Sequence, residues 1–282
     1  MFLTHNTVPA SRNFRKTVLA VSLAFLIAMM SGTALAGEWT SSVYPATPGT
    51  RHAPALRYWV YTPDDLKPGL PLVVYLHSSD GVKFTAMKDI LPVFIDDGTI
   101  AHPQAIVLVP QLTRDLRLFW SDAIVSVDAV VKSVMEEYEV DTSRISLTGA
   151  SLGGNGVWTL ASLSPGRYAR LLSIGGWVDA GITADSFAQF EEIKVFSAKD
   201  KPNNRKSSEK FVDSLKSIGV NASWESLNLE HMDAPRMLYA DTDIQKWLWL
   251  IPEEDPEAEE ESVPEAAEEI SEETDPGSSV PQ

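Results

Sequence analysis

The feature that most constrains the fold is a glycine-rich stretch between a predicted strand and a predicted helix. It reads Gly149-Ala-Ser151-Leu-Gly153, after an apolar strand at 144–148 and before an apolar helix at 153–163. Small residues two positions before and after a serine allow a sharp turn with strained backbone angles, because larger side chains would collide there. The turn places the hydroxyl at a helix N-terminus, where the dipole and free N–H groups favour developing negative charge. The five-residue pattern is common by itself, but its flanking strand and helix indicate a nucleophilic serine at Ser151.

The rest of residues 37–252 alternates between strand-like and helix-like segments. Continuous apolar runs at 70–76 and 106–109 are typical of strands buried on both faces. Apolar residues spaced three and four apart predict an amphipathic helix over 124–138. Further strands are predicted at 56–61, 144–148, 171–174, 194–197 and 222–227, and further helices at 153–163, 208–218 and 241–250. This order predicts one α/β domain, with helices on both faces of a mostly parallel sheet.

Composition excludes several classes of function. A chain of 282 residues, 44% of them hydrophobic, can bury a full-sized core. The chain contains no cysteine, which rules out disulfides, cysteine-ligated metal sites and a cysteine nucleophile. The formal net charge of −16 disfavours a nucleic-acid partner, because phosphate binding needs a basic surface.

The N-terminal residues 1–36 have the features of a secretory signal peptide. Three basic residues, Arg12, Arg15 and Lys16, precede an apolar run over 17–30, and Ala34-Leu-Ala36 then forms a small-residue cleavage site. The run is shorter than the ~20 residues of a typical transmembrane helix. An uncleaved N-terminal anchor is the alternative. Cleavage after Ala36 would give a mature protein that is secreted, or periplasmic in a bacterium, without a stable membrane anchor.

The C-terminal residues 253–282 predict a disordered acidic tail. They hold 13 Asp and Glu residues, no Lys or Arg, and almost no large apolar side chains. Such a segment cannot offset its ordering entropy by burial. A solubilising appendage is the simpler interpretation, and a binding tail for a cation or a basic partner is the alternative.

A serine nucleophile needs a general base and an acid that orients the base. When the serine stands on a strand-to-helix turn of this kind, the acid (Asp or Glu) comes after it in the chain, and the histidine base comes after the acid. Of the five histidines only His231 follows Ser151, in a loop just after the strand 222–227. Asp200 ends the strand near 194–197, and its strand-end position suits the orienting role. Its competitors are Asp179, Asp185 and Asp233.

Two backbone N–H groups should form an oxyanion hole beside the serine. One belongs to Leu152, the residue after the nucleophile, and the other lies in the loop after the strand 70–76. Ser79 is the first candidate for this second donor and Ser78 the second. His77 is interpreted as a structural residue beneath the loop.

Four stretches carry a resemblance to the α/β-hydrolase superfamily: 70–77, 141–158, 195–200 and 229–231. Within it the chain resembles secreted esterases related to polyhydroxyalkanoate depolymerases, feruloyl esterases and prolyl-oligopeptidase-like hydrolases. The resemblance spans nearly all of 55–250 and implies a triad of Ser151, Asp200 and His231 without metal or organic cofactor. Two features depart from the family: Ser78 stands where the loop usually has glycine, and the segment 201–206 is polar and basic.

The implied substrate is a small-molecule or polymeric ester, and the oligomeric state is not predicted. The segment between 174 and 193 leaves no room for a large lid, and its Trp177 and Phe187 could line a substrate pocket. Plain core packing is the alternative for both side chains. Two other functions remain open: a peptidase of the same fold, and a non-catalytic binding protein on a hydrolase scaffold.

Overall fold

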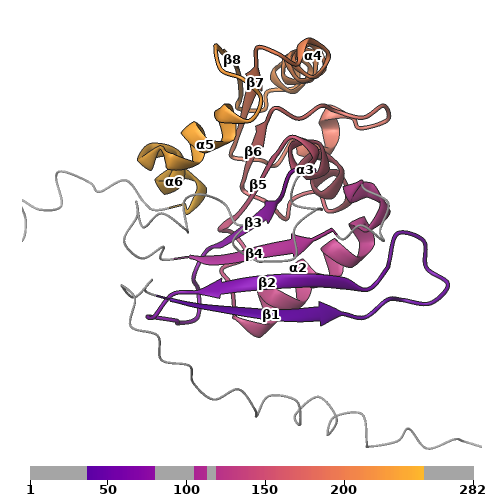
Figure 1. Cartoon of the computed structure of the whole chain (residues 1–282), viewed down its shortest axis with the longest axis vertical. Helices are drawn as coiled ribbons and strands as arrows, with labels where there is room; N and C mark the ends of the chain where they lie inside the picture. Colours follow the sequence, from indigo (N-terminus) through magenta and orange to yellow (C-terminus); the bar gives the residue numbers. More distant parts are fainter. Residues whose placement is uncertain (1–36, 80–104, 113–118, 251–282) are drawn as a thin grey trace, which may run out of the picture. The chain divides into compact units, whose positions relative to one another are not determined.

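The protein is built around an eight-stranded mixed sheet (Figure 1). The computed structural model describes residues 37–79, 105–112 and 119–250. The strand order is β1-β2-β4-β3-β5-β6-β7-β8. The strands β1, β2 and β4 pair antiparallel, and all the others pair parallel. Their bounds are β1 Glu38–Tyr44, β2 Leu56–Thr62, β3 Leu72–Leu76, β4 Ile106–Gln111, β5 Ile145–Ala150, β6 Arg170–Ile174, β7 Glu192–Ala198 and β8 Ala222–Leu227.

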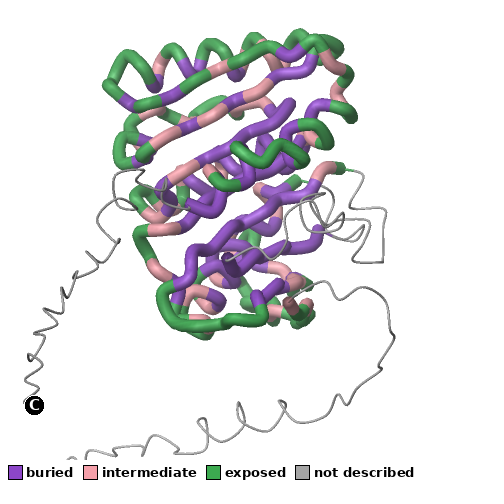
Figure 2. Tube along the Cα trace, turned by 90° about the vertical axis from the view of Figure 1, so that its left-hand side faces the viewer, coloured by how far each residue is buried: buried purple, intermediate pink, exposed green. Residues whose placement is uncertain are grey.

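Alternating side chains of the central strands build a core on each face of the sheet. Leu72, Val74 and Leu76 pack on one face, whereas Val73 and Tyr75 pack on the other. The first core also contains residues of the helices α2 Ile124–Glu137, α3 Leu152–Leu163 and α4 Pro202–Ser217. The second core contains residues of α5 Asp233–Ala240 and α6 Thr242–Leu248. Helices therefore cover both faces, and Figure 2 shows the central strands as almost continuously buried.

The predicted fold class is confirmed, with differences at the edges. The strand β1 was not predicted because it is an edge strand whose side chains are mostly exposed and polar. The helix α5 was not predicted either, and α4 starts at Pro202, six residues before the predicted start. Two 3-10 turns, η5 Trp120–Asp122 and η6 Ala184–Phe187, complete the described elements.

The predicted signal peptide at 1–36 and acidic tail at 253–282 lie outside the described residues. In the part of the chain that the structure does describe, no helix is both long enough and apolar enough to cross a membrane.

The parallel arrangement brings several loops to one edge of the sheet. The strands β3, β5, β6, β7 and β8 all point the same way, so their carboxyl ends lie at a common edge. Open α/β sheets place their ligand sites outside this edge. The predicted site residues follow these strands: Ser79 after β3, Ser151 after β5, Trp177 after β6, Asp200 after β7 and His231 after β8.

Candidate active site

Ser151 has the strained backbone that the glycine pattern predicts. Its φ of 54° and ψ of −110° lie in a region that residues with side chains rarely adopt. A Cβ on Gly149 would lie 2.5 Å from the backbone carbon of Gly153, and a Cβ on Gly153 would lie 1.8 Å from the carbonyl oxygen of Leu76. The N–H of Ser151 donates to the carbonyl of Ile174 at 2.8 Å. The turn is therefore pressed between two neighbouring strands, and only glycine fits on either side of the serine.

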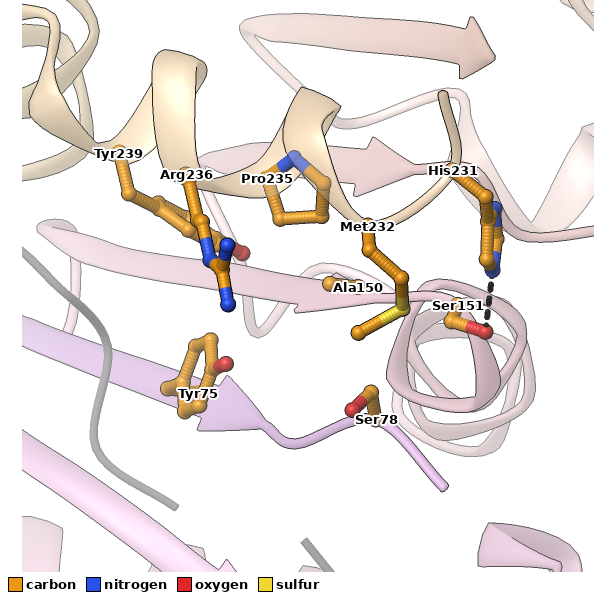
Figure 3. Close-up of a pocket in the computed structure, with 9 residues that line it drawn as sticks. All are labelled: Tyr75, Ser78, Ala150, Ser151, His231, Met232, Pro235, Arg236 and Tyr239. Atoms are coloured by element: carbon orange, nitrogen blue, oxygen red, sulfur yellow. Dashed lines mark hydrogen bonds between the residues drawn. The ribbon is translucent and has the colours of Figure 1, made fainter. Parts of the chain in front are cut away.

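His231 meets Ser151 at this turn. Its Nε2 lies 2.7 Å from the serine Oγ, although 80 residues separate them in sequence (Figure 3). His231 stands in the loop between β8 and α5, and both side chains are half-buried. When the hydroxyl donates to Nε2, that nitrogen is positioned to take the serine proton during nucleophilic attack. The structure thus brings together the predicted nucleophile and the predicted base.

Gly175 makes the position of the histidine ring possible. It has a φ of +62°, and a Cβ there would lie 2.8 Å from Cε1 and 2.9 Å from Nδ1 of His231. The glycine is fixed by two hydrogen bonds, since its N–H donates to the Phe196 carbonyl at 2.7 Å and its carbonyl accepts from Asn204 at 3.0 Å. The imidazole therefore lies directly against the backbone of Gly175, which these two hydrogen bonds hold in place.

Asp200 lies in the turn after β7, beside the loop that carries His231. The adjacent N–H of Lys199 donates to the carbonyl of Leu229 at 3.1 Å, and the Lys199 ammonium pairs with Glu230 at 3.0 Å. The Asp200 side chain is exposed, and within the described residues no hydrogen bond joins it to His231. The structure thus brings its backbone near the base without joining the two side chains, and its orienting role stays a prediction.

The competing acids have other surroundings. The Asp179 carboxylate accepts hydrogen bonds from Asn155 at 3.0 Å and from the Trp177 indole at 2.9 Å, which ties the loop after β6 to α3. Asp185 belongs to η6, and Asp233 is the first residue of α5. Asp179 thus has a structural role that Asp200 lacks.

The predicted oxyanion donors border the turn. Leu152 is the first residue of α3, so its N–H has no partner within the helix and stands beside Ser151. In the loop after β3, Ser78 lines the same pocket as Ser151, whereas Ser79 is exposed and is not among the lining residues. Of the two candidates, the second, Ser78, is therefore the one that lines this pocket.

His77 is buried and hydrogen-bonded beneath the loop after β3, in agreement with the structural role expected from the sequence. Its Nε2 accepts from the N–H of Leu112 at 3.0 Å, which leaves Nδ1 to donate to the carbonyl of Ser78 at 2.7 Å. Its own carbonyl accepts from the Trp120 indole at 3.2 Å. Burial lowers the pKa of His77 to about 4, so the ring is neutral at physiological pH. The ring thus fixes the backbone just before the predicted oxyanion donors.

A pocket opens from the serine–histidine pair and extends between α5 and the ends of β3 and β5 (Figure 3). Its cavity volume is about 120 Å³, and it opens to solvent. The lining residues are Tyr75, Ser78, Ala150, Ser151, His231, Met232, Pro235, Arg236 and Tyr239. This wall is mostly apolar with a few polar groups, as is usual for small-molecule sites.

The two predicted pocket residues lie elsewhere. Phe187 is fully buried in an aromatic cluster with Trp158 and Phe211, on the core face opposite α5, which corrects its prediction as a pocket residue. Trp177 is half-buried and is not among the lining residues; its carbonyl accepts from Asn155 at 3.1 Å.

Sequence reasoning missed the wall that α5 supplies. Arg236 follows His231 by five residues and Tyr75 precedes His77 by two, so proximity to predicted site residues was the only available signal. Among the described residues there is no cluster of three or more His, Asp or Glu side chains that could hold a metal ion.

A strained serine turn, a histidine after the last strand and a mostly parallel sheet define the α/β-hydrolase fold, and solved structures share it. A thermostable esterase superposes with a TM-score of 0.63 at 22% identity, covering 75% of this chain and 62% of that one. A thermostable esterase from Pseudomonas putida superposes with a TM-score of 0.59 at 14% identity, covering 77% and 83%.

Sequence comparison gives a distant match of the same kind. Feruloyl esterase B of Talaromyces stipitatus is 25% identical over 173 residues, which are 56% of this chain. The match spans only 45% of that relative's length. No family model matches the chain. These similarities confirm the resemblance to esterases of the α/β-hydrolase fold, feruloyl esterases among them.

Proposed function

We propose that this protein is an exported serine hydrolase that cleaves carboxylic esters. The observation that carries the proposal is the 2.7 Å hydrogen bond between Ser151 Oγ and His231 Nε2 at a strained strand-to-helix turn. Both residues are half-buried and line the same pocket, where a substrate could reach them. The similarity to esterases supports the same activity. Export rests on the signal-peptide pattern at 1–36.

The reaction proceeds in two steps through an acyl-enzyme. Ser151 Oγ attacks the ester carbonyl as its proton passes to His231 Nε2, and the resulting imidazolium protonates the departing alcohol. Water then attacks the acyl-serine, giving its proton to the same nitrogen, and the serine leaves with that proton as the carboxylic acid is released. The Leu152 N–H and an N–H from the loop at 78–79 stabilise the oxyanion in both steps.

Asp200 is the proposed orienting acid, and its neighbours suggest how it would act. Its turn is tied to the histidine loop through Lys199, whose N–H donates to the Leu229 carbonyl and whose ammonium pairs with Glu230. In that role it would hold the Nδ1-protonated tautomer and stabilise the imidazolium without taking the proton.

Hydrolysis of short-chain p-nitrophenyl esters tests the proposal directly. The mature chain from residue 37 should turn these esters over, and Ser151→Ala should reduce kcat by about a thousandfold or more. Ser217→Ala, an exposed serine in the last turn of α4, controls for handling and folding. Equal rates for Ser151→Ala and Ser217→Ala would contradict a serine mechanism. Cleavage of matched anilides at rates similar to those of the esters would instead favour a peptidase.

One observation favours a non-catalytic binding protein as the second candidate. The Asp200 side chain is exposed and has no hydrogen bond to His231 within the described residues. A fluorophosphonate probe separates the two functions, because it reacts with activated serines. Labelling of Ser151 in folded protein, abolished in Ser151→Ala, would support the hydrolase. Failure to label would support the binding protein.

A further inference from the structure

Among the described residues that line the pocket, Arg236 is the only lysine or arginine. Its side chain projects from α5 at the end of the pocket that lies opposite Ser151 and His231, above Tyr75 (Figure 3). The described residues of the wall include no aspartate or glutamate. A guanidinium in this position gives the mostly apolar pocket a positive end.

The arginine has no ion pair with any described residue. By contrast, Arg167 pairs with Asp128, and Arg170 lies 3.8 Å from Glu191. Asp233 precedes Arg236 by three residues on α5, a spacing that permits a pair, yet none forms between them. The guanidinium faces the pocket (Figure 3), and no hydrogen bond from its five N–H donors to another described residue is present.

We propose that the substrates are esters carrying a second, negatively charged group, a carboxylate, on the part that occupies this pocket. The proposal rests on the proposed esterase function. The carbonyl carbon would lie at Ser151 and the carboxylate at Arg236, with an apolar stem between them along Met232 and Pro235. A single planar guanidinium matches one carboxylate in a two-point hydrogen bond, whereas a dianionic phosphate usually recruits several cations.

Tyr75 supplies a second polar contact at the same end. Its ring is buried against Tyr239, and its hydroxyl is directed into the pocket (Figure 3). Burial raises the pKa of Tyr75 above its ordinary value, so the phenol stays neutral and can donate a hydrogen bond to an anion. Tyr239 is committed elsewhere, since its hydroxyl lies 2.8 Å from Thr148 Oγ1. The anionic end of the substrate would thus meet one charged and one neutral donor.

A pair of esters with equal chain length tests the proposal. The kcat/KM for p-nitrophenyl hemiglutarate is divided by that for p-nitrophenyl valerate, which has the same number of carbons and a methyl group in place of the carboxylate. The ratio should fall about tenfold in Arg236→Gln, because a charge-assisted hydrogen bond is lost, and should recover partly in Arg236→Lys. Lys216→Gln, in the last turn of α4, removes the same charge where no pocket residue lies, and its ratio should match the wild type. High salt should lower the wild-type ratio, because Arg236 is exposed.

The result that overturns the proposal is a ratio that Arg236→Gln leaves at its wild-type value, or shifts no more than Lys216→Gln does. Hydrolysis of both esters would then keep the esterase function and remove the anionic specificity.

A binding measurement keeps the proposal falsifiable if no ester is hydrolysed. Calorimetry with Ser151→Ala protein compares monomethyl glutarate with methyl valerate. Preferential binding of the glutarate, lost in the Ser151→Ala, Arg236→Gln double variant, would support the anion site by itself. Equal binding of the two esters would overturn it.

Discussion

At the scale of single residues, the site depends on where glycine leaves space. Gly149 and Gly153 let the serine turn lie against its neighbours, and Gly175 lets the histidine ring lie against the end of β6. The first two follow from the sequence pattern, because the motif is local. The third does not, because its contact joins residues 56 positions apart, Gly175 and His231.

Gly175→Ala should disable the site while leaving the protein folded. The added Cβ would lie 2.8 Å from the His231 ring, and the hydrogen bonds to Phe196 and Asn204 hold the backbone, so the ring must move. We expect kcat to fall roughly 10–100-fold, because a displaced base loses its alignment with Ser151. Gly181→Ala is the matched control, since Gly181 has a φ of +96° and nothing within 4 Å of an added Cβ. Equal kcat values for the two variants would mean that the ring contact is unimportant.

At the scale of elements, a charged cluster fastens α2 to the segment that follows α3. Asp128 on α2 accepts a hydrogen bond from Ser164 Oγ at 2.6 Å and pairs with Arg167 and Lys132. The Asp128 and Arg167 side chains are only 12% and 14% exposed, so the pair is shielded from water. These contacts lower the pKa of Asp128 against the opposing effect of burial. The cluster therefore supports the helix whose N-terminus carries Ser151.

Asp128→Asn should lower the free energy of unfolding by about 2 kcal/mol, because it leaves the shielded Arg167 without its counter-charge. Urea denaturation measures the loss. Asp65→Asn removes the partner of Lys67 in a pair whose side chains are 72% and 60% exposed, and it should leave the unfolding free energy unchanged. Comparable losses in both variants would show that shielding does not distinguish the two pairs.

At the scale of the whole molecule, the predictable part of the fold is the part that is buried on both faces. The apolar runs at 70–76 and 106–109 predicted β3 and β4, because a strand buried on both faces of a sheet needs a continuous apolar sequence. The edge strand β1 and the helix α5 escaped prediction, since the first is mostly exposed and the second has a proline in its first turn. The pocket wall comes from α5, which is why Arg236 could not be foreseen while Ser151 and His231 could.

Global stability should depend on the protonation of His77, a group that touches both the loop after β3 and the end of β4. Burial lowers its pKa to about 4 from an ordinary value of 6.5. The unfolded chain therefore binds the proton more tightly than the folded protein, so stability is fully present above pH 6.5 and declines as the pH falls toward 4. The shift corresponds to a loss on the order of 3 kcal/mol across that window.

His77→Gln isolates this contribution, because glutamine can still accept from the Leu112 N–H but does not titrate. Unfolding free energies are measured by urea denaturation at about pH 7, above the window, and at about pH 4.5, near its lower end. The variant should be less stable than wild type at the higher pH, and its loss between the two values should be smaller by about 2 kcal/mol. All other titrating groups are common to both proteins and cancel in this comparison. Parallel pH dependences would show that the buried imidazole is not the group that limits stability in acid.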